Sequence, residues 1–164
     1  MLKPVSKRKP AAVGGRYVIV ASRYNTRYVD SMLRAARAEL KRGQAREVVV
    51  VRVPGAFEIP VVVGRLTRPF GPGYDAVICL GVILRGQTTH AEHIGTGVTH
   101  ALIQLQIETG CPIIHEVLLL ENEAQARERC LGQEHNRGTE AAQTAIEMVR
   151  VMRSLPAPDD DVPF

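Results

Sequence analysis

The chain has 164 residues and a mass of 18.0 kDa, which fits one compact domain with its own hydrophobic core. Its hydrophobic fraction of 45% and charged fraction of 23% are ordinary for globular proteins and exclude a wholly disordered chain. No apolar run approaches the ~20 residues of a membrane-spanning helix, and the basic N-terminus is not followed by the apolar stretch of a secretory signal. We therefore expect a cytoplasmic protein with no membrane partner.

The net charge of +4 is concentrated at the start of the chain. The first ten residues hold four bases and no acid, namely Lys3, Lys7, Arg8 and Lys9. Without these four, 17 basic residues face 17 acidic ones, so the rest of the chain is neutral. A duplex-binding protein needs basic residues gathered on a folded face. We expect no nucleic-acid partner, with weak polyanion binding by the basic segment as the minor alternative.

Both ends of the chain carry the signals of loops. Residues 1–15 hold two prolines and a Gly-Gly pair, which predicts a flexible N-terminal arm. Residues 155–164 hold three prolines and three consecutive aspartates, which predicts a C-terminal tail. The intervening residues 16–154 contain no repeat and no low-complexity linker, so we expect one domain there.

Within that domain, short apolar runs alternate with helical patterns. The runs lack polar alternation, which indicates strands covered on both faces; they span residues 17–21, 48–51, 76–80 and 113–120. Helical stripes span residues 29–40, 94–105 and 142–152, and Gly43 and Gly110 are placed to end the first two. Residues 61–66 are ambiguous, because β-branched side chains oppose a helix while the alternation requires one. This order predicts an α/β fold, a three-layer α/β/α sandwich with a mostly parallel sheet.

Ligands of such sheets bind outside the carboxyl ends of the strands. Four segments follow predicted strands and hold most of the unusual polar residues: 22–25, 53–58, 81–90 and 120–122. We therefore expect the functional site at these segments.

The strongest local signal is the stretch Arg85-Gly-Gln-Thr-Thr-His90, which leaves a strand and opens a helix. Gly86 permits a tight turn, and Gln87, Thr88 and Thr89 expose backbone N–H groups at a helix N-terminus. Such groups and the helix dipole suit a phosphate. The alternative is that Thr88 or Thr89 only caps the helix, but capping does not account for the arginine before it and the histidine after it.

His90 would lie beside that phosphate on the first turn of the helix, where a histidine can transfer protons near neutral pH. The alternative is an ordinary solvent-facing residue. His93 and His100 lie farther along the same helix and receive no role. The spacing of His90, Glu92 and His93 does not match a known metal-binding motif, so we expect no metal.

Two further segments carry candidate ligand contacts. In residues 53–60, prolines fix the backbone and Gly55 allows close approach of a ligand. Glu58 there could accept hydrogen bonds from a polyol, or it could be a solvated residue of a rigid turn. Tyr24 offers an aromatic ring for stacking and Asn25 offers an amide for hydrogen bonds, a combination that suits a planar heterocycle. The alternative for Tyr24 is core packing.

The three cysteines, Cys79, Cys111 and Cys130, are widely spaced and form no CxxC pair. This pattern supports neither a zinc ribbon nor a dithiol redox site. Cys79 falls in an apolar run, where we expect a buried, reduced thiol.

Five segments together resemble the lumazine synthase family, whose members make 6,7-dimethyl-8-ribityllumazine in riboflavin biosynthesis. The matching segments run in family order over roughly residues 16–153: 22–25 (SRYN), 53–60 (VPGAFEIP), 80–90 (LGVILRGQTTH), 121–129 (ENEAQARER) and 136–138 (NRG). The resemblance implies a flavodoxin-like sheet. It also implies a transferase that condenses 5-amino-6-(D-ribitylamino)uracil with 3,4-dihydroxy-2-butanone 4-phosphate, without metal or organic cofactor.

The resemblance also implies roles for individual residues. The uracil substrate would contact Tyr24, Asn25, Ala56, Phe57, Glu58, Val82, Ile83, Leu84 and, from a neighbouring subunit, His115. The butanone phosphate would be held by Arg85, Gln87, Thr88, Arg129 and Arg137, with His90 as the proton donor. Three positions depart from the usual family pattern: Tyr24 and His115 stand where Phe is usual, and Arg137 stands where Lys is usual.

Family members complete each site from an adjacent subunit, so the resemblance implies a homo-oligomer. Relatives are pentamers or closed shells of twelve pentamers. By the resemblance, several free pentamers carry an insertion between the last two helices, and the short stretch between Arg129 and Asn136 has none. We therefore expect a pentamer and favour the 60-subunit shell, with riboflavin synthase as a candidate partner.

Two other functions fit the same pattern. A flavodoxin-like module would bind a flavin or nucleotide and convert nothing, but it has no particular use for His90. A shell protein that has lost turnover would not need Arg129 and His90. An assay of lumazine formation separates both from the enzyme.

Overall fold

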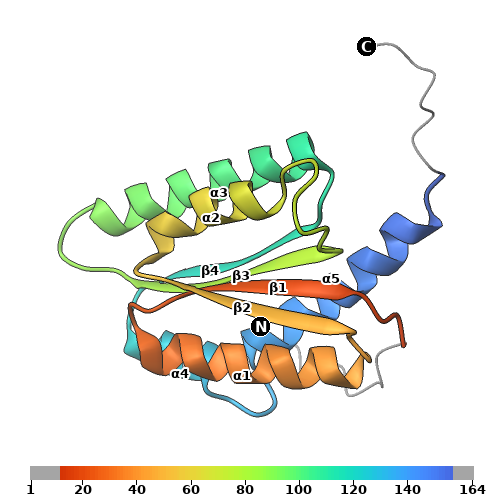
Figure 1. Ribbon diagram of the computed structural model, residues 1–164. Coiled ribbons are helices and arrows are strands. Elements are labelled where there is room, and N and C mark those ends of the chain that lie inside the picture. Colours follow the sequence, from red (N-terminus) through yellow and green to blue (C-terminus); the bar gives the residue numbers. More distant parts are fainter. Residues whose placement is uncertain (1–11, 157–164) are drawn as a thin grey trace.

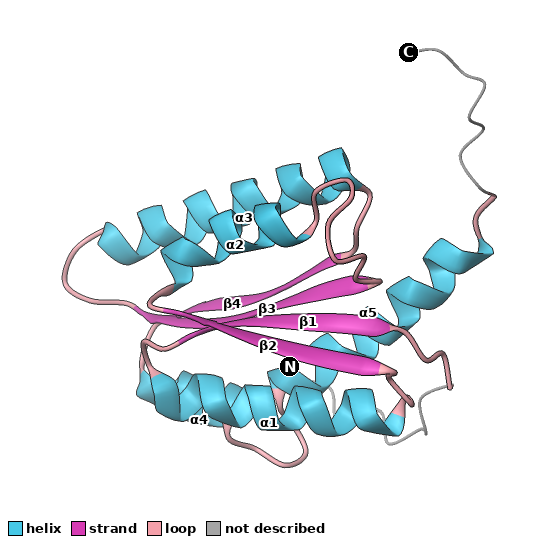
Figure 2. Ribbon diagram, in the orientation of Figure 1, coloured by secondary structure: helices cyan, strands magenta, loops and turns pink. Residues whose placement is uncertain are grey.

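The computed structural model describes residues 12–156, and within this range a parallel four-stranded sheet lies between two layers of helices (Figures 1 and 2). The strands are β1 (Arg16–Ser22), β2 (Glu47–Val53), β3 (Ala76–Leu84) and β4 (Ile113–Leu120), in the order β2-β1-β3-β4. The helices are α1 (Thr26–Arg42), α2 (Ile59–Leu66), α3 (His90–Thr109), α4 (Glu123–Cys130) and α5 (Arg137–Ser154), with a single 3₁₀ turn, η1 (Ala56–Glu58). The expected three-layer α/β fold is confirmed, and every strand pair is parallel.

Alternate residues of each strand enter two separate cores, which explains the continuous apolar runs. In β1, Tyr17, Ile19 and Ala21 pack against α1, α4 and α5, whereas Val18 and Val20 pack against α2 and α3. Figure 2 shows these two helical layers on opposite faces of the sheet. Because both faces are covered, the strands carry no exposed polar face.

The ambiguous segment after Pro60 is helix α2. Pro60 stands at the start of the helix, where its missing N–H removes no hydrogen bond. Ile59 and Val63 lie one turn apart, and both are fully buried against the neighbouring strand and α3. Burial of this face outweighs the weak helix preference of the β-branched residues.

Helix α4 has no apolar stripe that would predict it from periodicity. It is held instead by a capping bond, in which the side chain of Asn122 accepts the backbone N–H of Gln125 at 3.0 Å. Only Ala126 and Cys130 of the helix are buried. Helices α1 and α3 end at Gly43 and Gly110 as expected.

The expected arm and tail fall mostly outside the described residues. Just inside the described range, the carbonyl of Val13 accepts a hydrogen bond from Arg153 at 2.6 Å, and the carbonyl of Gly15 accepts one from the backbone of Arg46 at 2.8 Å. None of the helices within residues 12–156 has the length and apolar character needed to cross a membrane.

The three cysteines are free thiols. Cys79 in β3 and Cys130 in α4 are buried, and Cys111 before β4 is half-buried. Burial raises the pKa of all three thiols, to about 11 for Cys111 and about 12 for Cys130.

Candidate active site

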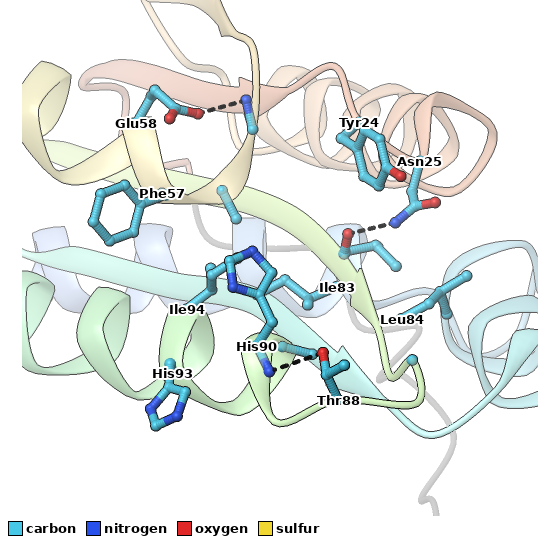
Figure 3. Close-up of a pocket in the computed structure, with 15 residues that line it drawn as sticks. Tyr24, Asn25, Phe57, Glu58, Ile83, Leu84, Thr88, His90, His93 and Ile94 are labelled. Carbon is cyan, nitrogen blue, oxygen red and sulfur yellow. Dashed lines mark hydrogen bonds between the residues drawn. The ribbon is translucent and has the colours of Figure 1, made fainter.

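A cleft of about 780 Å³ opens at the carboxyl ends of β1, β2 and β3, where the sequence predicts the site (Figure 3). Its lining combines two exposed aromatic rings, the end of β3 and the first turn of α3. The lining residues are Tyr24, Asn25, Gly55, Ala56, Phe57, Glu58, Val82, Ile83, Leu84, Gly86, Thr88, His90, Ala91, His93 and Ile94.

Asn25 fixes the edge of the cleft formed after β1. Its backbone takes the left-handed conformation (φ 56°), which asparagine tolerates better than most residues. Its side-chain amide donates to the carbonyl of Val82 at 2.8 Å, which joins the ends of β1 and β3. The adjacent Tyr24 is 73% exposed, so the core-packing alternative for this ring is wrong.

The 3₁₀ turn η1 forms the second side of the cleft. The carboxylate of Glu58 accepts the backbone N–H of Gly55 at 2.8 Å and closes the turn. Glu58 is thus part of a rigid turn and also lines the cleft, so both interpretations of this residue hold in part. Phe57 is 65% exposed, and in Figure 3 the ring of His90 lies between Phe57 and Tyr24.

The loop between β3 and α3 forms the third side. Thr88 accepts the backbone N–H of His90 only at 3.4 Å, and Thr89 at the N-cap makes no side-chain capping bond. Capping is therefore a weak explanation for these threonines. Thr88 lines the cleft, whereas the exposed Gln87 and Arg85 lie outside the lining.

Arg85 is held by acidic partners. It forms ion pairs with Glu92 on α3 and, at 3.2 Å, with Glu121 after β4. All three side chains are at least 40% exposed, so these pairs contribute little stability. They connect Arg85 to the first turn of α3 and to the end of β4.

His90 is the first residue of α3, and its exposed side chain points into the cleft (Figure 3). His93, to which the sequence assigned no role, lines the same cleft, and its Nε2 lies 3.4 Å from the hydroxyl of Thr89. The spacing in the sequence could have predicted this position of His93, because it follows His90 by three residues and residues three apart share a helix face. His100 lies outside the cleft.

His115 lies outside this chain's own cleft, on the face of β4 that packs against α3. The backbone N–H of Val117 donates to its Nδ1 at 3.1 Å, and its Nε2 lies 2.8 Å from the hydroxyl of Thr99. That hydroxyl donates to the carbonyl of Gly95, so it accepts a hydrogen bond from the Nε2–H group. With one ring nitrogen accepting and the other donating, these contacts favour the neutral form of His115. Burial also favours the neutral form, because it lowers the pKa of His115.

Arg129 and Arg137 also lie outside the cleft, in the layer on the other side of the sheet. Arg137 donates from Nε to the buried carboxylate of Glu116 at 2.6 Å and also pairs with Glu140. Arg129 has a buried Nε that finds no partner among the described residues. The sequence analysis missed Glu116, although a carboxylate inside an apolar run was a usable signal.

No cluster of three or more histidine, cysteine or acidic side chains within residues 12–156 is arranged to hold a metal ion. The lining of the cleft itself offers aromatic rings, backbone groups, hydroxyls and imidazoles.

Comparison with known proteins identifies relatives over almost the whole domain. The family model described as 6,7-dimethyl-8-ribityllumazine synthase matches residues 14–153. The protein of that name from Kineococcus radiotolerans is 41% identical over 144 residues, which cover 87% of this chain and 88% of the relative. Those from Xanthomonas campestris pv. campestris and Pyrococcus furiosus are both 39% identical, over 86% and 87% of this chain and 92% and 88% of the relatives.

Proposed function

The chain belongs to the 6,7-dimethyl-8-ribityllumazine synthase family, and on this premise we propose how its own residues carry out the reaction. The enzyme is a transferase that forms 6,7-dimethyl-8-ribityllumazine, a step of riboflavin biosynthesis. Its substrates would be 5-amino-6-(D-ribitylamino)uracil and 3,4-dihydroxy-2-butanone 4-phosphate. The amine and the ketone form an imine with loss of water, phosphate leaves, and the ring closes with loss of a second water.

The observation that carries this proposal is the composition of the cleft. An apolar cavity between two exposed aromatic rings, with a histidine at a helix N-terminus, suits a flat heterocycle that reacts with a phosphorylated partner. Neither Tyr24 nor Phe57 is needed by the core, since they are 73% and 65% exposed. A substrate ring stacked on them would recover the apolar area that they leave in water.

We assign the uracil substrate to the side of the cleft formed by β1, η1 and β3. Tyr24 stacks on its ring, and the backbone from Val82 to Leu84 offers hydrogen bonds to its edge. Glu58 uses Oε2 to close its own turn, which leaves Oε1 to accept a hydrogen bond from a ribityl hydroxyl. Because the turn is already formed, little ordering is required on binding.

We assign the phosphate of the second substrate to the loop before α3. The first N–H groups of a helix lack partners within it, and the helix dipole favours an anion at that end. Gln87 and Thr88 are the residues that lead into this helix. His90 would transfer protons as phosphate leaves and the ring closes, a role that suits an exposed imidazole.

We further propose that copies of the chain complete one another's clefts. His115 and Arg129 do not reach the cleft of their own chain, yet by resemblance both serve the substrates. A pentamer in which each chain offers these residues to its neighbour would resolve this. The connection between α4 and α5 spans only residues 131–136, which is compatible with the closed 60-subunit shell.

The direct test supplies the purified protein with both substrates and follows the absorbance of the lumazine product. We expect product only when both substrates and protein are present, and a much slower rate with His90→Ala. If the uracil binds but no product appears above the uncatalysed rate, the cleft is a binding module and the proposed mechanism is wrong.

A further inference from the structure

A buried carboxylate lies in β4, on the face opposite His115. Glu116 is only 4% exposed, and its strand neighbours Ile114 and Leu118 pack into the core formed with α1, α4 and α5. Burial raises the pKa of Glu116, while the charge and hydrogen bond of Arg137 lower it. A carboxylate in such surroundings requires a cationic partner.

Arg137 is that partner, and two of its three nitrogens already donate to carboxylates. Its Nε donates to Glu116 at 2.6 Å, and its Nη1 pairs with Glu140, one turn along the same helix. Burial lowers the pKa of Arg137, but the two carboxylates together outweigh burial and raise it. A guanidinium held between two carboxylates is poorly placed to bind a substrate phosphate as well.

Arg129 is the second cation near the same carboxylate. It lies close enough to Glu116 to lower the pKa of that carboxyl, and both residues also influence the pKa of the thiol of Cys130, the residue after Arg129. No ion pair between Arg129 and Glu116 forms in the described structure. Its buried Nε has no partner among the described residues, so one edge of the guanidinium is uncommitted.

We propose that Arg137 is a positioning residue: by occupying Glu116, it keeps Arg129 free to bind the phosphate of the substrate. Without Arg137, the buried carboxylate would be left unpaired, and Arg129 would turn inward to neutralise it. This inference rests on the proposed function in one respect, that Arg129 serves the phosphate. It assigns to Arg137 a role different from the direct phosphate contact that the resemblance implies.

The test compares Arg137→Gln with the double variant Glu116→Gln/Arg137→Gln. In the single variant we expect KM for the butanone phosphate to rise ~10- to 100-fold, the scale for loss of a charge-assisted hydrogen bond, with KM for the uracil unchanged. In the double variant no buried charge remains to attract Arg129, so KM should return to within ~3-fold of wild type. A double variant as weak as the single variant would show that Arg137 contacts the phosphate itself and would overturn the inference.

A matched control and a fallback variant keep the test decisive. Arg150→Gln removes an arginine from the exposed part of the same helix and should leave both KM values unchanged; within residues 12–156, Arg150 pairs with Glu147 at 2.8 Å. If Arg137→Gln does not fold, the double variant alone decides, because a direct phosphate contact predicts a raised KM there and the positioning role does not.

A second readout does not depend on turnover. Inorganic phosphate should raise the melting temperature of the wild type and of the double variant, but not that of Arg137→Gln; an equal rise in all three would contradict the inference. A wild type that forms no lumazine yet shows this pattern would refute the proposed function and leave the positioning role intact.

Discussion

Gly138, in the first turn of α5, lies directly against the backbone of α1. A Cβ atom added at this residue would stand 2.0 Å from the carbonyl oxygen of Met32 and 2.6 Å from its Cα. Ordinary contacts of a Cβ begin near 3.4 Å, so the two helices would have to separate by more than 1 Å. The neighbouring atoms belong to a backbone in a fully buried core, and no flexible side chain can move aside.

The expected cost of Gly138→Ala follows from this geometry. Overpacking of a core costs about 1–3 kcal/mol, and a clash with backbone belongs at the upper end. The better helix propensity of alanine returns about 1 kcal/mol at most. We therefore expect the free energy of unfolding to fall by about 2–3 kcal/mol, which lowers the melting temperature by roughly 4–12 °C for a chain of this size.

Thermal and urea unfolding at equal protein concentration measure this loss, with Gly97→Ala as the matched control. Gly97 lies in the middle of α3, is exposed, and would place its Cβ in open space. The same substitution there should raise stability by up to about 1 kcal/mol. If Gly138→Ala is as stable as the wild type, α1 and α5 are not packed as described and the reasoning fails.

Four further predictions concern the site and the assembly. His90→Ala should lower kcat ~100-fold and change its pH profile; an unchanged kcat and profile would remove His90 from the mechanism. Arg129→Lys should raise KM for the butanone phosphate far more than KM for the uracil, because lysine cannot bind a phosphate in two places; equal effects would refute the assignment. Burial lowers the pKa of His115, so the unfolded chain binds a proton there more readily than the folded chain, and the protein loses stability as the pH drops below ~6.5. His115→Phe should lose that part of the slope of unfolding free energy against pH between pH 7 and 5. An unchanged slope would show that the ring does not stay neutral. Light scattering should give a mass near sixty chains of 18.0 kDa, and a mass near five chains would refute the shell.

The strands and the larger helices could be predicted because their patterns reflect burial on the faces that the fold covers. The apolar runs became four parallel strands, and Gly43 and Gly110 end their helices as expected. Helix α2 could not be decided locally, because its β-branched residues gain their stability from contacts with α3. Helix α4 was invisible to periodicity, since it buries only Ala126 and Cys130.

The position of the cleft could be predicted from the sequence, whereas the contacts within it could not. The strand-end rule located the cleft, because it follows from topology alone. The double use of Glu58 could not be foreseen, because the hydrogen bond to Gly55 depends on the geometry of the turn. The buried ion pair of Glu116 could not be predicted, because the apolar neighbours of Glu116 dominate the pattern of its strand. Its partner Arg137 lies 21 residues away along the chain.

The raised pKa values of the three thiols mean that the natural cysteines react slowly with thiol-directed labels. With a pKa of about 11, Cys111 is almost wholly protonated near neutral pH, and the thiolate is the form that reacts with maleimides or disulfides. Cys79 and Cys130 are buried besides. A cysteine introduced on the exposed surface would therefore carry a dye or a cargo at one site per chain, with no need to remove the natural thiols first.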